Sequence, residues 1–156
     1  LIEGGAQERG KRAGTENLPG IIGLAAALKD AQENMQQNTA YITGLRDALR
    51  NGLDKIDGAG FNGSREHCLP GTVNYSFQGV NGEALLSLLS NEGICCSSGS
   101  ACSAGSLEPS HVLLALGLSH ETAQSALRFS LCEYNTMDEV QTIITKVTEA
   151  VNRLRR

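Results

Sequence analysis

A single cysteine stands inside a run of ten small residues, SSGSACSAGS at 97–106. Serine, glycine, alanine and cysteine give a core no large apolar side chain, and such a run favours neither a helix nor a strand. We therefore expect 97–106 to be a mobile loop that carries the Cys102 thiol. A thiolate on such a loop could accept sulfur at one place and deliver it at another. The alternative is an inert free thiol, which is the commoner case for a lone cysteine on a loop.

Arg128 is the second residue that could do chemistry. It lies between Leu127 and Phe129 in an alternating segment, a pattern that predicts a strand with one polar side. A strand holds an arginine more rigidly than a loop does, and the planar guanidinium group suits a carboxylate. The alternative is an ordinary ion pair with a neighbour such as Glu133.

The other cysteines are expected to be structural. The chain has five cysteines and no C-x-x-C pair, which argues against a zinc site of the usual spacing. Reduced thiols of a cytosolic protein are the default interpretation, and most of them should be small buried residues. We expect Cys95 and Cys96 in or near the core, at the end of a short strand, and Cys68 and Cys132 in structural positions.

Hydrophobic spacing predicts the elements that must hold these residues. Residues 1–17 are polar, Gly-rich and basic, and they indicate either an anion-binding loop or a solvated linker. Residues 18–56 repeat apolar side chains near a 3.6-residue period, which predicts one long helix that Asn17 caps and that connects two lobes. We expect residues 57–156 to form a small α/β domain, in which 97–106 is the catalytic loop if Cys102 accepts sulfur.

The expected order within that domain is β-α-β-α-α-β-α, a small sheet covered by helices. The predicted elements are a strand at Val73–Phe77, a helix that Asn81 caps and Gly93 ends, a short strand at Ile94–Cys96, a helix from Pro109, a short helix from Ser119, a strand at Leu127–Leu131 and a final helix that starts at a Thr136/Glu139 capping box.

The composition is that of a soluble globular protein, and we expect it to be cytoplasmic because its cysteines are expected to be reduced. The 156 residues are 40% apolar and 19% charged, with a formal net charge of -4. This mild acidity argues against nucleic acid as the main partner, and no apolar run reaches the ~20 residues that a membrane-spanning helix needs. There is no leader of the secretory type. The start at Leu1, inside a Gly-rich segment, suggests a fragment of a longer chain.

Three motifs resemble one family. The segments SSGSACSAGSLEPSHVL (97–113) and LRFSL (127–131) resemble the signature of cysteine desulfurases of the nitrogen-fixation and iron–sulfur-cluster type. These are pyridoxal-phosphate enzymes of the class-V aminotransferase family. GGAQERGKRAGTEN (4–17) resembles the segment that follows their cofactor lysine, and the motifs come in the family's order. The resemblance implies the small C-terminal domain of the aspartate-aminotransferase-like fold, with a long inter-domain helix near the N-terminus.

The resemblance also implies roles for single residues. Cys102 matches the cysteine that becomes a persulfide, and Arg128 matches the arginine that binds the carboxylate of the substrate L-cysteine. Thr15 matches the threonine that reaches the cofactor phosphate across a homodimer, with Arg9 and Arg12 in support. The implied reaction converts L-cysteine to L-alanine and passes the sulfur to an acceptor such as an iron–sulfur scaffold protein.

One part of the family pattern is missing. The family's cofactor lysine follows a histidine, and none of the lysines here does so: Lys11, Lys29, Lys55 and Lys146. Residues 1–17 would then be an active-site and dimer loop of a large domain absent from this chain. We expect the chain alone neither to hold pyridoxal phosphate covalently nor to turn over cysteine. Two alternatives stay open, a cofactor-free sulfur carrier or thiol-exchange module, and an α/β interaction module in which 97–106 is a linker.

Overall fold

The computed structural model describes residues 2–98 and 109–156. The described backbone divides into two compact units, one that ends at Gln37 and one that covers Asn38–Arg156. The sheet and the hydrophobic core both belong to the second unit, which therefore carries most of the packing. Within the described part of the chain, no helix is long and apolar enough to cross a membrane.

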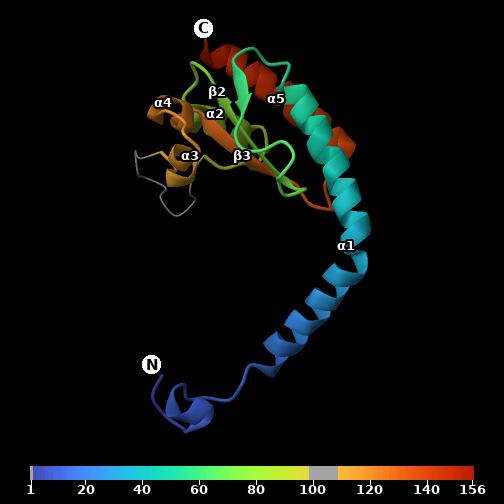
Figure 1. The fold of residues 1–156 in the computed structure, drawn as a ribbon, viewed down its shortest axis with the longest axis vertical. Helices are drawn as coiled ribbons and strands as arrows, with labels where there is room; N and C mark the ends of the chain where they lie inside the picture. Colours follow the sequence, from blue (N-terminus) through green and yellow to red (C-terminus); the bar gives the residue numbers. More distant parts are fainter. Residues whose placement is uncertain (1, 99–108) are drawn as a thin grey trace. The chain divides into compact units, whose positions relative to one another are not determined.

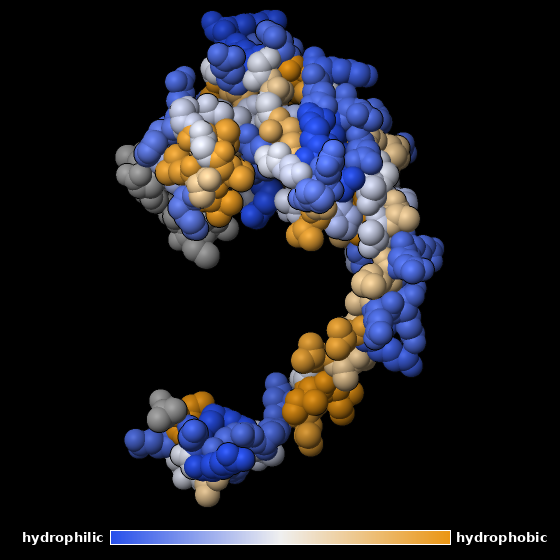
Figure 2. Space-filling model, viewed as in Figure 1, coloured by the Kyte–Doolittle hydropathy of each residue, from blue (hydrophilic) through white to orange (hydrophobic). Residues whose placement is uncertain are grey.

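Helix α1 runs over Leu18–Leu53 (Figure 1). The predicted Asn17 cap is confirmed, because its side-chain oxygen accepts a hydrogen bond from the Gly20 amide at 3.1 Å. The helix changes its surroundings along its length. Its last turns bury Leu45, Leu49 and Leu53, whereas the large apolar side chains of its first half are more than half exposed and stand out in Figure 2: Leu18, Ile21, Ile22, Leu24, Leu28 and Met35.

The sheet has three antiparallel strands in the order β1-β2-β3. They are β1 (Ala59–Phe61), β2 (Thr72–Phe77) and β3 (Ala126–Ser130). β2 and β3 confirm two predicted strands, and β1 was not predicted because three residues are too short for a visible alternation. The predicted strand at Ile94–Cys96 is wrong. Residues 94–96 form no strand, and the nearest pairing is an isolated bridge between Ser97 and Arg128.

One face of the sheet forms the core. Side chains alternate along a strand, so odd-numbered residues of β2 and β3 point to this face. The helices that cover it are the last turns of α1, α2 (Gly82–Asn91) and α5 (Met137–Leu154). Burial of each large apolar side chain here stabilises the fold by about 1.5–3 kcal/mol. The strand residues concerned are Val73, Tyr75, Phe77, Leu127 and Phe129.

The described residues cover the opposite face only at one end. Helices α3 (His111–Ala115) and α4 (His120–Gln124) bring Leu113 and Ala123 onto Ala126, the first residue of β3. The even-numbered residues further along β2 and β3 are polar, and Arg128 is among them. This partial cover leaves an open polar strip on the sheet.

The predicted helix starts are mostly confirmed. Side-chain caps occur at Asn81, at Ser119 and at Thr136, where Glu139 completes the capping box. The positive φ of Gly93 ends α2 as predicted. α3 instead starts after Ser110 rather than at Pro109. The mixed α/β fold with a small sheet and a long N-terminal helix is therefore the one expected.

Candidate functional site

Arg128 sits at the centre of β3, with its side chain exposed on the open face of the sheet. Its backbone is hydrogen-bonded to Ser97, the first residue of the Ser/Gly segment 97–106. The Arg128 amide donates to the Ser97 carbonyl at 2.8 Å, and the Ser97 amide donates to the Arg128 carbonyl at 3.1 Å. The segment 97–106, which contains Cys102, therefore starts directly beside Arg128.

Cys102 itself lies outside the described residues, as does most of the predicted loop 97–106. In the sequence, Cys102 follows Ser97, the bridge partner of Arg128, by five residues. The two residues predicted to act on one substrate are thus connected through a short tether.

The guanidinium group of Arg128 has no partner in the part of the chain that the structure describes. Among residues 2–98 and 109–156 it forms no ion pair and no side-chain hydrogen bond, so the alternative of an ion pair with Glu133 is not realised. An arginine on a strand, with its backbone held by Ser97 and its side-chain donors without a partner among the described residues, can bind a planar anion such as a carboxylate.

Two asparagines continue the polar strip from Arg128 across the sheet. Asn74 of β2 is the register partner of Arg128, and Asn62 follows β1 and donates its amide to the Asn74 carbonyl at the backbone. The Asn62 side-chain nitrogen also donates to Asn74 Oδ1 at 2.7 Å and to Ser76 Oγ at 2.8 Å. Sequence reasoning missed Asn62 and Asn74 as site residues.

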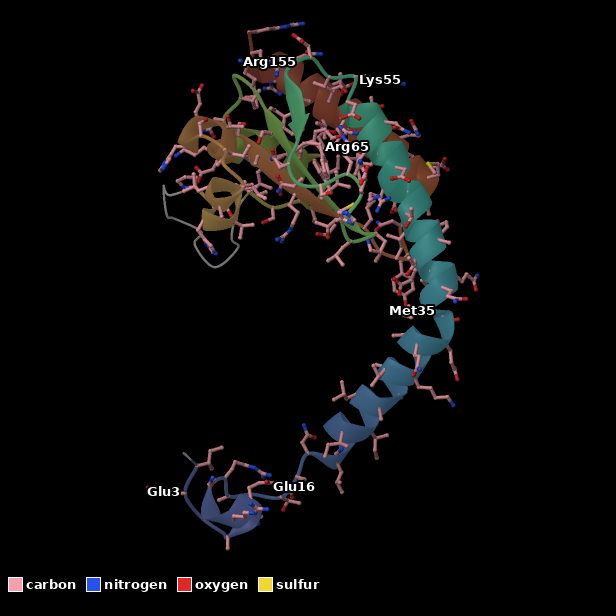
Figure 3. All side chains as sticks on the ribbon, in the orientation of Figure 1. Glu3, Glu16, Met35, Lys55, Arg65 and Arg155 are labelled. Atoms are coloured by element: carbon pink, nitrogen blue, oxygen red, sulfur yellow. The ribbon has the colours of Figure 1, made fainter. Side chains whose placement is uncertain are left out.

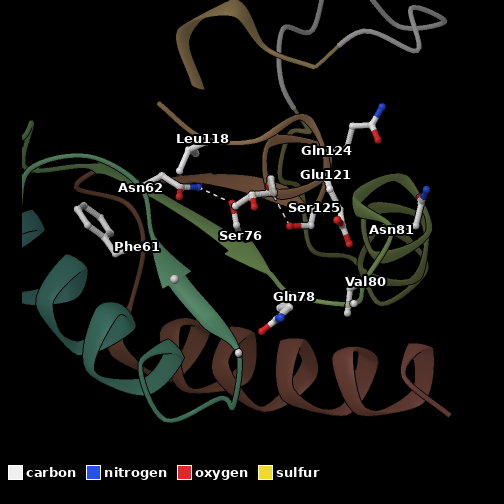
Figure 4. Close-up of a pocket in the computed structure, with 14 residues that line it drawn as sticks. Phe61, Asn62, Ser76, Gln78, Val80, Asn81, Leu118, Glu121, Gln124 and Ser125 are labelled. Atoms are coloured by element: carbon white, nitrogen blue, oxygen red, sulfur yellow. Dashed lines mark hydrogen bonds between the residues drawn. The ribbon is translucent and has the colours of Figure 1, made fainter. Parts of the chain in front are cut away.

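A cavity of about 710 Å³ opens beside this strip. Figure 4 shows Asn62 and Ser76 on its wall, joined by their hydrogen bond, and Glu121 and Ser125 of the α4 region opposite. The cavity wall is of mixed polarity, and Glu121 is its only charged residue among those described. It lies at the covered end of the open face, whereas Arg128 is not part of its wall.

A second polar network anchors β2 from the core side. The buried Tyr75 hydroxyl donates to Asp54 Oδ1 at 2.6 Å, and Arg65 donates to both oxygens of the same carboxylate at 2.7 and 2.9 Å. Figure 3 shows Arg65 beside the last turns of α1. The Arg65 hydrogen bonds hold the pKa of Asp54 below its usual value, and burial followed by the Asp54 contact raises the pKa of Tyr75. This network fixes the strand that carries Asn74.

Thr15 belongs to the unit that ends at Gln37 and is exposed. Its hydroxyl makes no hydrogen bond within the described chain. The loop before it is shaped by Arg12, which donates to the Gly14 carbonyl at 2.6 Å and pairs with Glu16 at 2.5 Å and Glu8 at 3.4 Å. Arg12 is thus engaged within its own loop and leaves Thr15 available to another group.

The lysines do not fit the covalent cofactor site. A lysine that forms an imine must lose its proton, which burial away from carboxylates favours. Lys146 instead contacts Glu92 at 3.1 Å and Glu149 at 3.4 Å, and these hydrogen bonds raise its pKa. Lys29 pairs with Glu33, and Lys11 and Lys55 are exposed.

No described cysteine is fully buried, which differs from the general expectation, but Cys96 lies against the core as predicted. Cys95 and Cys132 are exposed, and Cys68 and Cys96 are half-buried. Cys96 packs against the core, where burial, with a smaller effect of Cys95, raises the pKa of its thiol to about 11. Cys68 accepts a hydrogen bond from Arg46 at 3.4 Å. None of the described cysteines belongs to a metal-binding cluster of the described chain.

A small antiparallel sheet with helices on its core face, and with an exposed arginine on the other face beside the start of the Ser/Gly segment, defines an α/β domain. The family profile "Aminotransferase class-V" matches residues 5–143. The chain belongs to the class-V aminotransferase family, and the resemblance seen in the sequence is confirmed.

Relatives and solved structures agree with this assignment. The chain is 47% identical over 156 residues to a "Cysteine desulfurase" of Nostoc sp. (strain PCC 7120) and 46% identical over 155 residues to "Cysteine desulfurase IscS" of Methanosarcina thermophila. Each alignment covers 99% of this chain and 39% or 38% of the relative.

Among solved structures, a "NifS-like protein" matches with a TM-score of 0.83 at 39% identity, over 98% of this chain and 38% of that one. The cysteine desulfurase CsdA of Escherichia coli matches with a TM-score of 0.70 at 26% identity, over 90% of this chain and 32% of that one. The chain thus spans well under half the length of the proteins it resembles.

Proposed function

We propose that this chain is the substrate-carboxylate-binding and sulfur-accepting part of a cysteine desulfurase, which converts L-cysteine to L-alanine. The observation that carries the proposal is the pairing of Arg128 with Ser97 at the base of the loop that holds Cys102. The 44–47% identity to proteins named cysteine desulfurase supports it.

Arg128 binds the substrate carboxylate and so presents the substrate sulfur to the loop. The Cys102 thiolate attacks that sulfur, an S–S bond forms, and the bond between the sulfur and the β-carbon breaks. The bonding electron pair stays with the β-carbon, which takes up a proton. The amino acid then leaves as alanine. Cys102 keeps the sulfane sulfur as a persulfide and passes it to an acceptor such as an iron–sulfur scaffold protein.

Pyridoxal phosphate supplies the electron sink for this chemistry when it is bound. The lysines of this chain do not fit its covalent site, so we propose that the isolated chain is inactive and needs the part that its longer relatives also have. Residues 1–17 belong with that part as an active-site and dimer loop, in which the free Thr15 hydroxyl would contact the cofactor phosphate. The exposed apolar side chains of α1 support packing against a further surface. We place the intact homodimer in the cytoplasm.

The test uses the intact enzyme that carries these residues. L-cysteine should yield alanine, and mass spectrometry should find one extra sulfur on the peptide that contains Cys102. Cys102→Ser should abolish both signals, whereas Cys132→Ser, an exposed thiol elsewhere, should keep them. Sulfur found on Cys95 or Cys132 in place of Cys102 would refute the assignment.

The alternative of a cofactor-free sulfur carrier rests on the lysines, none of which suits imine formation. The two functions differ in what the 156-residue chain does alone. A carrier would take sulfur onto Cys102 from a small persulfide donor and release it to a thiol. The desulfurase part should show no absorption band of an internal Schiff base after incubation with pyridoxal phosphate, and no alanine formation.

A further inference from the structure

We propose that Asn74 is a second carboxylate-binding residue, which donates its side-chain amide to the same ligand carboxylate as Arg128. The inference rests on the proposed function and extends it to a residue on a different strand. It is carried by the strand register and by the hydrogen bonds of Asn62.

The register places the two side chains in the closest arrangement that a sheet allows. The ladder bonds between β2 and β3 pass through odd-numbered residues of β2, as the bond from Leu131 to Gly71 (2.7 Å) and the bond from Phe77 to Ser125 (3.3 Å) show. Asn74 and Arg128 are therefore a non-hydrogen-bonded pair. The Cβ atoms of such pairs lie about 4.5–5.5 Å apart on the same face.

Asn62 fixes the orientation of the Asn74 side chain. Its nitrogen donates to Asn74 Oδ1 at 2.7 Å, so the acceptor end of the Asn74 amide points toward β1. The bond from the same nitrogen to Ser76 Oγ, visible in Figure 4, holds Asn62 in turn. The amide nitrogen of Asn74 is left as a donor, and it has no partner among the described residues.

The neutral Asn74 amide and the charged Arg128 guanidinium group therefore lie on neighbouring strands, and neither donates to another described residue. A carboxylate has two oxygens and accepts several hydrogen bonds, so it can bind both donors at once. An amine or a neutral amide ligand would leave the guanidinium group without a charge partner. The half-buried Asn74 would add selectivity for an acid over its amide.

The experiment compares two ligands of the intact holoenzyme, L-alanine and L-alaninamide, which differ only in the carboxylate. Asn74→Asp keeps an oxygen for Asn62 but replaces the free donor with a charged acceptor. It should weaken L-alanine binding about 100-fold or more and L-alaninamide binding by less than about threefold, because it removes a hydrogen bond to a charged group and adds repulsion. Asn74→Ala should weaken L-alanine binding and raise the KM for L-cysteine by about 10- to 100-fold.

Ser130→Ala is the matched control, since Ser130 is exposed on the same face two residues along β3, and it should bind both ligands like the wild type. Melting temperatures check that each variant is folded. If Asn74→Asp does not fold, Asn62→Ala, which releases the Asn74 amide, should still lower the preference for L-alanine over L-alaninamide.

The inference would be overturned if both Asn74 variants preferred L-alanine over L-alaninamide as strongly as the wild type does, while Arg128→Ala bound L-alanine more weakly. That result would leave the proposed function intact. A wild-type enzyme that neither binds L-alanine nor converts L-cysteine would overturn the proposed function itself. A parallel loss of both ligands in Asn74→Ala would assign Asn74 a structural role and contradict the inference.

Discussion

The contact between Tyr75 and Asp54 should be measurable as both a stability and a pH effect. Tyr75→Phe keeps the buried ring and removes only the hydroxyl, whose bond to the Asp54 carboxylate is 2.6 Å long. Hydrogen bonds to charged groups contribute about 1.5–3 kcal/mol. Asp54 is 34% exposed and keeps both Arg65 bonds, so solvent screening places the loss near the lower end, at about 1.5–2 kcal/mol. The melting temperature should fall by about 3–8 °C.

The pH dependence follows from the directions of the two pKa shifts. The pKa of Asp54 is lowered in the folded state, so its contribution is present above the unfolded value of 3.8 and is lost as the pH falls through the folded pKa. The pKa of Tyr75 is raised, so its contribution is present below the unfolded value of 10.0 and is lost as the pH rises. The stability difference between wild type and Tyr75→Phe should therefore be largest between these two values.

Equilibrium urea unfolding of the chain, followed by circular dichroism from acidic to alkaline pH, measures this difference. Tyr134→Phe is the control, because Tyr134 is 84% exposed and forms no hydrogen bond within the described residues. It should change the unfolding free energy by less than about 0.5 kcal/mol. Equal stability of Tyr75→Phe and wild type at neutral pH, or a difference that does not narrow at either extreme, would refute the assigned hydrogen bond.

Two further substitutions test the elements around the site. Gly71→Ala would place its Cβ against the Leu131 carbonyl oxygen at the start of β2, and thermal unfolding should show a loss of about 1–3 kcal/mol. Gly60→Ala, with open space around its Cβ, should not be destabilised to that extent. Thr136→Ala removes the α5 cap and should cost about 1 kcal/mol, with a matching loss of helical signal at intermediate urea; an unchanged midpoint would contradict the cap.

The sequence predicted the elements whose signals are local. The caps at Asn17, Asn81 and Thr136 depend on residues three positions apart, and the alternation around Tyr75 is visible within six residues. The short strand β1 and the exposure of Cys95 depend on neighbours distant in the chain. Local patterns carry no information about those neighbours, so both were missed.

Arg128 and Asn74 show the same limit at the site. Alternation placed each on the polar side of its own strand, but 54 positions separate them, and only the strand register pairs them. The sequence also could not show that Arg128 and Glu133 form no ion pair in the described structure, because the two residues are only five positions apart. The motif around Cys102 was found only because it resembles a known signature.

The sheet explains why the position of Arg128, the start of the segment 97–106 and the core can all depend on one short strand. In β3 the odd residues Leu127 and Phe129 are anchored in the core, which fixes Arg128 between them on the opposite face. The Arg128 backbone cannot bond to β2, because Asn74 is its non-hydrogen-bonded partner, so its amide and carbonyl face outward and bind Ser97. The non-hydrogen-bonded pairing places Asn74 next to Arg128 on one edge of β3. The same pairing leaves the Arg128 amide and carbonyl free of β2, so that they bond to Ser97 on the other edge. A one-residue slip of β3 would turn Arg128 to the core face and break its two backbone bonds to Ser97, so the strand register determines both.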